Sequence, residues 1–218
     1  MIGDKISVKK HHYPPAREII AATREAVRSS DSVFSYGIGG ESGSGKSTLS
    51  LALRELLQRE EGLNSFIFHM DDYYKQPPED THRQREQSLS KVGPEEVDLE
   101  RLEKHIRQVK KGADRLRKPL VHYRENVIRE VIVELDAVDV VIAEGTYCTL
   151  LEPVDCRIFM LRSYKETYDA RRTRGRDPTD PLIEKVLEFE HNLIRGHAER
   201  ADILVDREYR IRVVGLQP

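Results

Sequence analysis

The chain has 218 residues, a net charge of −2 and a charged fraction of 34%. This length is typical of one domain, or of one domain with a small insertion. The nearly balanced charge argues against general affinity for nucleic acid or for an anionic membrane surface. A hydrophobic fraction of 38% is sufficient to form a core.

The two cysteines, Cys148 and Cys156, are too few for a zinc framework or a disulfide scaffold. Free thiols of this kind are typical of a reducing cytosol. Residues 1–12 lack the apolar segment of a signal peptide, and no stretch approaches the about 18 apolar residues of a membrane helix. The sequence therefore predicts a soluble cytoplasmic protein without nucleic-acid or membrane partners, and it leaves homo-oligomer formation open.

Short apolar strands alternate with amphipathic helices along the chain. In order, we expect a helix at 16–28, a strand at 33–38, a helix at about 46–60, a strand at 65–70, a helix from Asp98 through Lys111, a hairpin of strands at 120–123 and 127–135, strands at 138–143 and 157–161, helices at about 163–174 and 181–197, and a strand at 201–205. Residues 76–95 are polar and contain prolines, which predicts a loop or irregular insertion. The alternation predicts an α/β fold, with a parallel sheet covered by helices on both faces.

A glycine-rich loop follows the strand at 33–38 and precedes a helix. It matches the template G-x-x-x-x-G-K-[ST] at every fixed position, over Gly40, Glu41, Ser42, Gly43, Ser44, Gly45, Lys46 and Ser47, with Thr48 next. In such a P-loop, backbone amides and the lysine bind the phosphates of ATP, and the serine hydroxyl is placed to bind Mg²⁺. A glycine-rich turn that merely caps the helix is one alternative, against which all fixed positions and both flanks of the motif argue. A dinucleotide-binding fingerprint would need glycine where Ser42 stands and would leave Lys46 and Ser47 unexplained.

Carboxylates follow two other predicted strands. Asp71 and Asp72 come after the strand at 65–70, and Glu144 follows the strand at 138–143. Because ligands bind at the carboxyl ends of parallel strands, we expect Asp71 beside the γ-phosphate as a general base. Glu144 could share Mg²⁺ with Ser47. Capping of the following turns is the alternative for both residues.

Four arginines lie within six residues, at Arg171, Arg172, Arg174 and Arg176. Their mutual repulsion would be relieved by bound phosphates, so we interpret the segment as a lid that closes over ATP, with Arg171, Arg172 and Arg176 in catalytic roles. A solvated helix end is the alternative. The predicted acceptor-binding residues are Asp72, Tyr74, Lys75, His122, Tyr123 and Arg124.

With these motifs, the chain resembles the uridine kinase and phosphoribulokinase group of P-loop kinases over about residues 33–206. The resemblance includes the His69–Lys75 segment and the Glu144-Gly145 turn. It implies that Asp71 is the base, that Glu144 and Ser47 serve Mg²⁺, that Tyr74 touches acceptor or phosphate, and that the arginines form the lid.

The sequence departs from uridine kinases at the acceptor motifs. Residues 90–94 replace the ribose-contacting N-F-D-x-P segment, and residues 119–123 only partly match the pyrimidine-binding motif. The resemblance therefore does not identify uridine as the substrate.

The combined interpretation is one P-loop kinase domain at 1–218, with an N-terminal helical extension at 1–30, an acceptor-side insertion at about 76–135 and a mobile lid at about 168–180. We expect ATP- and Mg²⁺-dependent phosphorylation of a small-metabolite hydroxyl, with a nucleoside as the first choice. Pantothenate or a sugar phosphate is the alternative acceptor. A nucleotide-dependent switch ATPase or a regulator without turnover is the alternative class, although the chain lacks the Asn-Lys-x-Asp motif of guanine-reading switches.

Overall fold

The computed structural model describes residues 7–168 and 181–216. Within these residues, six strands form one sheet in the order β2-β5-β1-β6-β7-β8. The strands are β1 (Phe34–Gly40), β2 (Ser65–His69), β5 (Val140–Glu144), β6 (Cys156–Met160), β7 (Ile203–Val205) and β8 (Ile211–Val213). Neighbouring strands are parallel except for β7 and β8, which are antiparallel. The predicted parallel sheet is confirmed.

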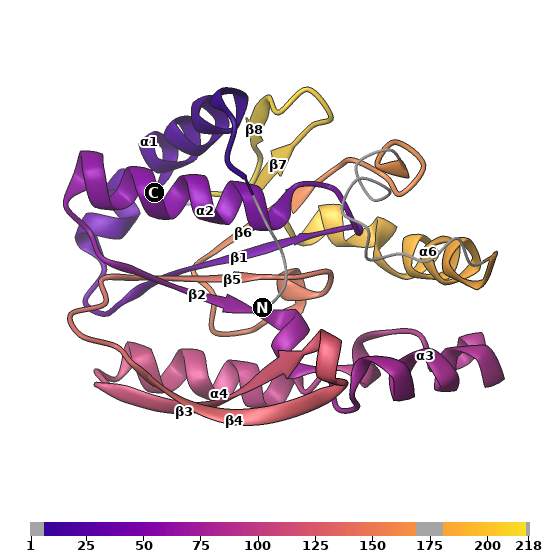
Figure 1. Ribbon diagram of the computed structural model, residues 1–218. Helices are drawn as coiled ribbons and strands as arrows, with labels where there is room; N and C mark the ends of the chain where they lie inside the picture. The colour runs from indigo at the N-terminus through magenta and orange to yellow at the C-terminus, as the bar shows by residue number, and fades with distance from the viewer. Residues whose placement is uncertain (1–6, 169–180, 217–218) are drawn as a thin grey trace.

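Helices cover both faces of the sheet (Figure 1). One face carries α1 (Tyr13–Ser29) and α2 (Lys46–Leu56), and the opposite face carries α4 (Leu99–Lys110). Two further helices, α3 (Pro78–Gln87) and α6 (Pro181–Ile194), lie beyond the carboxyl ends of the strands, in the right-hand part of Figure 1. The carboxyl edge of the sheet is therefore flanked by α3 and α6.

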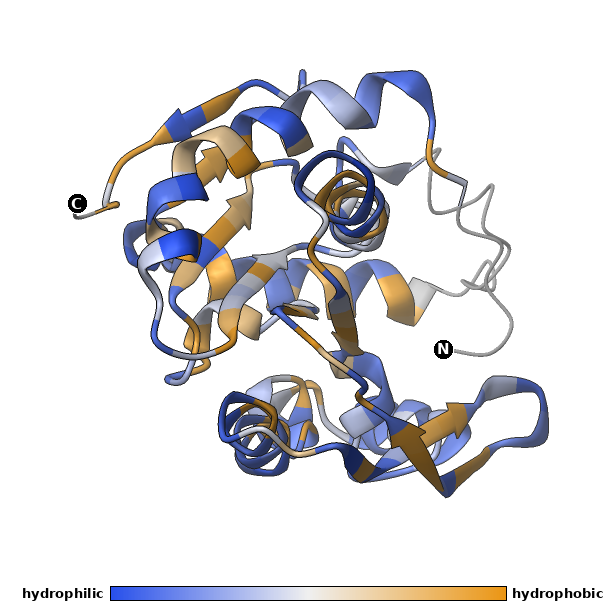
Figure 2. Ribbon diagram, turned by 90° about the vertical axis from the view of Figure 1, so that its left-hand side faces the viewer, coloured by the Kyte–Doolittle hydropathy of each residue, from blue (hydrophilic) through white to orange (hydrophobic). Residues whose placement is uncertain are grey.

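The central strands are short and apolar because they are buried on both sides. Every residue of β1 and β5 is buried, and Figure 2 shows apolar residues concentrated on the strands in the middle of the molecule. Leu49 and Leu53 of α2 are fully buried against this sheet together with Ile19 of α1. Burial of each such side chain contributes about 1.5–3 kcal/mol to folding.

The layer on the α4 face of the sheet also contains a hairpin of β3 (Arg115–His122) and β4 (Val127–Glu134). The predicted hairpin is confirmed, although β3 begins several residues earlier than expected. Asp98 caps α4 as predicted, since its Oδ1 accepts a hydrogen bond from Arg101 N at 3.0 Å. This layer packs against the β2 and β5 side of the sheet.

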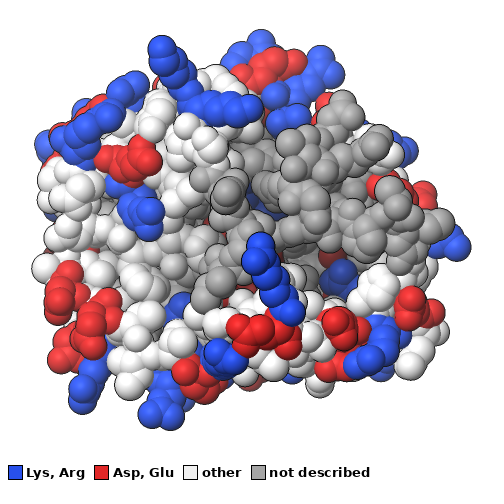
Figure 3. Space-filling view, in the orientation of Figure 1, with Lys and Arg blue, Asp and Glu red and all other residues white. Residues whose placement is uncertain are grey.

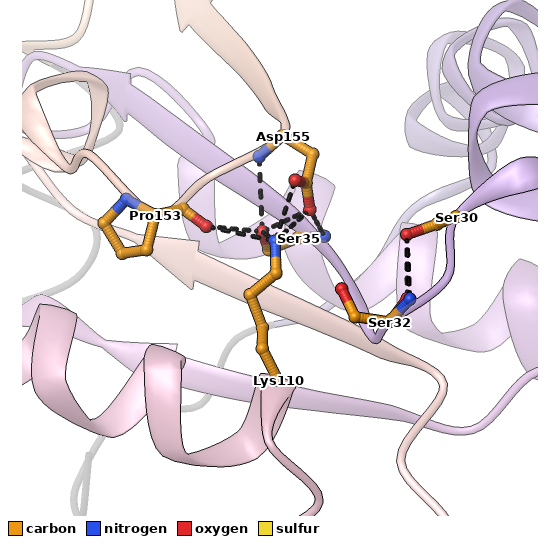
Figure 4. Close-up of polar contacts among 6 residues, drawn as sticks. All are labelled: Ser30, Ser32, Ser35, Lys110, Pro153 and Asp155. Carbon is orange, nitrogen blue, oxygen red and sulfur yellow. Dashed lines mark hydrogen bonds and ion pairs between the residues drawn. The ribbon is translucent and has the colours of Figure 1, made fainter.

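A polar cluster fixes this layer to the amino end of β1 (Figure 4). Lys110 Nζ, at the end of α4, lies 2.6 Å from Asp155 Oδ2. The same oxygen accepts hydrogen bonds from Ser35 Oγ at 2.7 Å and from Ser35 N at 2.8 Å. These contacts join three separate segments at the edge of the sheet opposite the P-loop, so the cluster is structural.

The prediction of a loop at 76–95 was wrong, because this stretch contains α3. Pro78 occupies the first turn, where a missing amide costs nothing, and Glu79 and Asp80 complement the positive end of the helix. The helix buries only Thr81. It therefore lacks the apolar periodicity by which the sequence could have indicated a helix.

Two other elements differ from expectation. Strand β8, which pairs with β7, was not predicted, because it has only three residues, one of them Arg212. Of the helix expected at about 163–174, residues 164–167 form turns, Tyr168 is helical, and residues 169–174 lie outside the described residues.

The surface carries both signs of charge. Figure 3 shows Lys and Arg intermixed with Asp and Glu around the face in view. No helix within residues 7–168 and 181–216 combines the length and the apolar character needed to cross a membrane.

Candidate active site

The glycine-rich loop connects the end of β1 to the start of α2 at Lys46. Its glycines Gly40, Gly43 and Gly45 have φ angles of 144°, 75° and 105°. A Cβ on Gly45 would lie 2.6 Å from Tyr209 Oη. The loop therefore depends on glycine both for its backbone angles and for close packing, and it opens towards the amino end of α2, where anions bind.

Two polar side chains of the loop, those of Lys46 and Ser44, are placed to bind phosphate. Lys46 Nζ donates hydrogen bonds to Gly40 O at 2.8 Å and Glu41 O at 2.9 Å, which holds its ammonium group over the loop. Ser44 Oγ is buried and has no hydrogen-bond partner among the described residues. Leaving a buried hydroxyl unpaired costs about 1–3 kcal/mol, and a phosphate oxygen in the loop would supply the missing partner.

The Glu41 carboxylate serves the protein itself. Glu41 Oε1 lies 2.7 Å from Nδ1 of His191 in α6, and Oε2 accepts a hydrogen bond from Tyr164 N at 2.5 Å. Thr167 Oγ1 also donates to Ser42 O at 2.8 Å. Glu41 and Ser42 therefore fix the loop to α6 and to the segment after β6. The Glu41 carboxylate is thus occupied by contacts within the protein.

Ser47 and Glu144 lie together, as the sequence predicted. Ser47 Oγ donates a hydrogen bond to Glu144 Oε2 at 3.1 Å. The other carboxylate oxygen, Oε1, is 2.6 Å from His69 Nδ1. His69 and Glu144 are register partners at the ends of β2 and β5. The sequence analysis gave His69 no role, although the aligned ends of the two apolar runs at 65–70 and 138–143 could have indicated this contact.

Glu144 is buried, with 3% of its surface exposed. Burial alone would raise the pKa of this carboxyl, but the hydrogen bond and charge of His69, the charge of Lys46 and the Ser47 hydroxyl together lower the pKa. Glu144 therefore remains ionised at neutral pH. An ionised carboxylate beside a serine hydroxyl is a donor set suited to Mg²⁺, which commonly takes one or two carboxylates and completes its shell with phosphate and water.

The adjacent aspartates after β2 have different environments. Both lie in the 3-10 turn η3 (Met70–Tyr73), where Asp71 is partly exposed and its charge acts on Tyr74 and on Glu190. Asp72 is 1% exposed; its Oδ2 lies 2.8 Å from Lys118 Nζ, and its Oδ1 accepts a hydrogen bond from Val121 N at 3.2 Å. Asp72 therefore attaches the β3-β4 hairpin to η3. This role replaces the acceptor contact that the sequence suggested.

The other predicted acceptor residues lie on the hairpin side of Asp71. Lys75 and Arg124 are exposed, whereas His122 and Tyr123 are partly buried at the end of β3, and Asn126 Oδ1 of the same turn accepts a hydrogen bond from Glu79 N of α3 at 2.9 Å. The structure thus groups these side chains beside η3 and α3.

Tyr74 belongs to a buried polar cluster that the sequence did not reveal. Arg85 of α3 contacts Glu96 through two hydrogen bonds of 2.7 and 2.9 Å. Arg85 Nη2 is also 3.4 Å from Tyr74 Oη and 3.6 Å from Oε1 of Glu190 in α6. These residues come from segments more than a hundred positions apart, and no local motif joins them. Sequence spacing therefore carries no signal for the cluster.

The predicted lid arginines Arg171, Arg172, Arg174 and Arg176 lie outside the described residues. Within residues 7–168 and 181–216, no group of three or more His, Cys, Asp or Glu residues could hold a metal ion by itself. A Mg²⁺ site at Ser47 and Glu144 would therefore need phosphate or water oxygens to complete it.

Comparison with known proteins gives matches to a family model, to a sequence relative and to solved structures. A model of the phosphoribulokinase/uridine kinase family matches residues 36–164. A uridine kinase from Clostridium novyi (strain NT) is 30% identical over 134 residues, which cover 61% of this chain and 61% of that protein. The aligned part therefore spans less than two thirds of this relative.

Solved structures share the fold at low sequence identity. A protein from Silicibacter sp. TM1040, assigned provisionally as a fructose transport system kinase, has a TM-score of 0.65 at 19% identity, with 86% of this chain and 95% of that chain covered. A D-glycerate 3-kinase from Cryptococcus neoformans var. grubii has a TM-score of 0.60 at 12% identity, with 94% and 100% covered. The three proteins are named as different kinases, so the similarity to them does not specify an acceptor.

Proposed function

The chain belongs to the phosphoribulokinase/uridine kinase family, and we propose that it transfers a phosphoryl group from ATP to a hydroxyl of a small metabolite in a Mg²⁺-dependent reaction. The observation that carries the proposal is the grouping of three different functional side chains after three neighbouring strands. Lys46 follows β1, Glu144 ends β5, and Asp71 follows β2. Because the sheet order is β2-β5-β1, these groups share one stretch of the carboxyl edge.

Each group has a separate task in this proposal. The loop amides and Lys46 bind the transferring phosphoryl group and stabilise its charge. Ser47 and Glu144 hold Mg²⁺, with His69 orienting the carboxylate. When bound, the metal ion neutralises charge on the phosphate oxygens. Asp71 orients the acceptor hydroxyl and accepts its proton.

The test is ATP consumption measured against a panel of small alcohols that includes nucleosides, free sugars, D-glycerate, pantothenate and sugar phosphates. We expect consumption that depends on an acceptor and yields a phosphorylated product. Lys46→Ala should reduce it by about 10²–10³-fold, since the lysine acts on transition-state charge. ATP hydrolysis that no acceptor stimulates but a protein partner does would favour a switch ATPase instead.

A further inference from the structure

Glu190 is a buried carboxylate on the acceptor side of the candidate site. Only 6% of its surface is exposed, and no hydrogen bond to its carboxylate occurs among the described residues. Its nearest ionic partner is Arg85 Nη2 at 3.6 Å, beyond hydrogen-bond distance. The charges of Asp71 and Lys46 both act on it. Nδ1 of His191, the next residue of α6, lies 2.7 Å from Glu41 Oε1 of the phosphate loop. Glu190 therefore lies near this loop, with its oxygens available to a ligand.

Arg85 does not neutralise Glu190, because it is already engaged elsewhere. Its guanidinium group makes a two-point contact with Glu96, which also accepts a hydrogen bond from Gly93 N at 3.0 Å. Such bidentate pairs are the strong form of this interaction. With one cation and two carboxylates, the cluster has an excess of one negative charge whenever Glu190 is ionised.

Tyr147 provides a second unsatisfied group beside this cluster. It follows the Glu144-Gly145 turn and is fully buried, and its Oη has no hydrogen-bond partner among the described residues. Tyr147 belongs to the buried cluster that includes Ile194 of α6 and against which Tyr74 packs, and the charges of Glu190 and Arg85 act on its phenol. Buried hydroxyl groups in proteins are nearly always hydrogen-bonded, so this unpartnered one needs an explanation, and a hydroxyl group of a bound ligand would supply the missing partner.

We propose that Glu190 and Tyr147 bind neighbouring hydroxyl groups of an uncharged polyhydroxyl acceptor, such as a free sugar or the ribose of a nucleoside. Glu190 also disfavours acceptors that carry a carboxylate or a phosphate. This inference rests on the phosphotransfer function proposed above and names the substrate class for the same site.

The chemistry of the two groups supports this class. A carboxylate accepts two hydrogen bonds from neighbouring hydroxyls, and a phenol can donate to one hydroxyl and accept from another. An anionic acceptor would be held close to Asp71 and to the buried Glu190, and at pH values where Glu190 is ionised the repulsion between like charges there is weakly screened. Arg85, the cation nearest to Glu190 among the described residues, is paired with Glu96, and Lys46 donates hydrogen bonds to the carbonyls of the phosphate loop. The site is therefore suited to a neutral molecule.

The first test is calorimetric titration of the full chain in the presence of Mg²⁺ and a non-hydrolysable ATP analogue. The neutral probes are uridine, D-ribose and D-fructose, and the anionic probes are D-glycerate, pantothenate and D-ribulose 5-phosphate. We expect at least one neutral probe to bind ten times more tightly than every anionic probe. Tightest binding by an anionic probe, or binding by none of the six, would overturn the inference.

The second test uses variants. Glu190→Gln should weaken binding of the neutral probe at least tenfold and reduce the difference in affinity between the neutral and the anionic probes. Its affinity for the ATP analogue should be unchanged. Glu188→Gln is the matched control, because it makes the same change at an exposed position of the same helix. Equal binding of the neutral probe by both variants would contradict a contact with Glu190.

Tyr147→Phe separates ligand binding from a structural role. Since Tyr147 Oη makes no hydrogen bond within the described residues, its removal should leave the melting temperature equal or higher while binding of the neutral probe weakens. A lower melting temperature with unchanged binding would show that the hydroxyl is structural.

Turnover measured with the same probes distinguishes the two proposals. Phosphorylation of D-glycerate in preference to every neutral probe would support phosphotransfer and overturn the neutral-acceptor inference. Neutral probes that bind through Glu190 but are never phosphorylated would contradict the phosphotransfer proposal and leave the binding inference standing.

Discussion

Replacing Glu190 by glutamine should change how the stability of the protein depends on pH. Burial is the main cause that raises the pKa of this carboxyl from 4.5 to about 7, and it outweighs the opposing charges of Arg85 and Lys46. Between these two pH values the folded protein holds a proton that the unfolded chain releases. Linkage then requires the free energy of unfolding to fall as the pH rises through this range.

The magnitude follows from the size of the shift. Each pH unit of displacement corresponds to about 1.4 kcal/mol, so a shift of about two and a half units gives about 3 kcal/mol. Glutamine cannot ionise and lacks this dependence. Glu190→Gln should therefore become more stable relative to the wild type by about 3 kcal/mol when the pH rises from 4.5 to 7.5.

The assay is urea unfolding of both proteins at half-unit pH steps, with Glu188→Gln as the control. The control should follow the wild type, because Glu188 is exposed. Comparison between variants removes the contributions of all other carboxyls, which are common to both. Parallel stability profiles of the wild type and Glu190→Gln would refute the claim that Glu190 is buried without a compensating partner.

Three further predictions concern the frame of the site. Lys118→Met should lower the free energy of unfolding by about 3–5 kcal/mol in urea titrations, because it leaves the buried Asp72 carboxylate unpaired. Adding Asp72→Asn to this variant should recover part of the lost stability. Losses of the two single variants that simply add up in the double variant would contradict the pairing. His69→Ala should raise the Mg²⁺ concentration needed for half-maximal ATP turnover by about 10–100-fold, since Glu144 loses its orienting partner; an unchanged Mg²⁺ titration would exclude that role. Gly45→Ala should cost about 1–3 kcal/mol of stability in thermal unfolding because of its φ of 105°, with loss of ATP binding; normal ATP affinity would contradict the loop geometry.

The sequence indicated the donor half of the site because that half is local. The P-loop places its glycines and Lys46 within eight consecutive residues, and their chemistry does not depend on distant contacts. The rule for carboxyl ends of parallel strands added Asp71 and Glu144, since both follow buried apolar runs. The contact between Ser47 and Glu144 confirms that Glu144 lies beside the P-loop. The roles of these residues in metal binding and catalysis stay proposals.

The acceptor half depends on contacts that spacing does not encode. Asp71 and Asp72 are neighbours, yet only the position of Lys118 on β3 shows that Asp72 is buried and paired. Arg85 lies on a helix that buries almost nothing, so hydrophobic periodicity could not reveal it. Glu190 is distant in sequence from its cluster. Such pairs become visible only when the fold brings α3 and α6 together at the sheet edge.

The most direct test of phosphotransfer is the effect of Asp71→Asn on product formation, measured alongside the affinity for ATP and Mg²⁺. Asparagine keeps the shape of the side chain but cannot take up the proton of the hydroxyl group that is phosphorylated. We expect product formation to fall by about 10²–10⁴-fold while ATP and Mg²⁺ bind as in the wild type. Product formation at the wild-type rate by Asp71→Asn, with the acceptor phosphorylated normally, would contradict the account of this site.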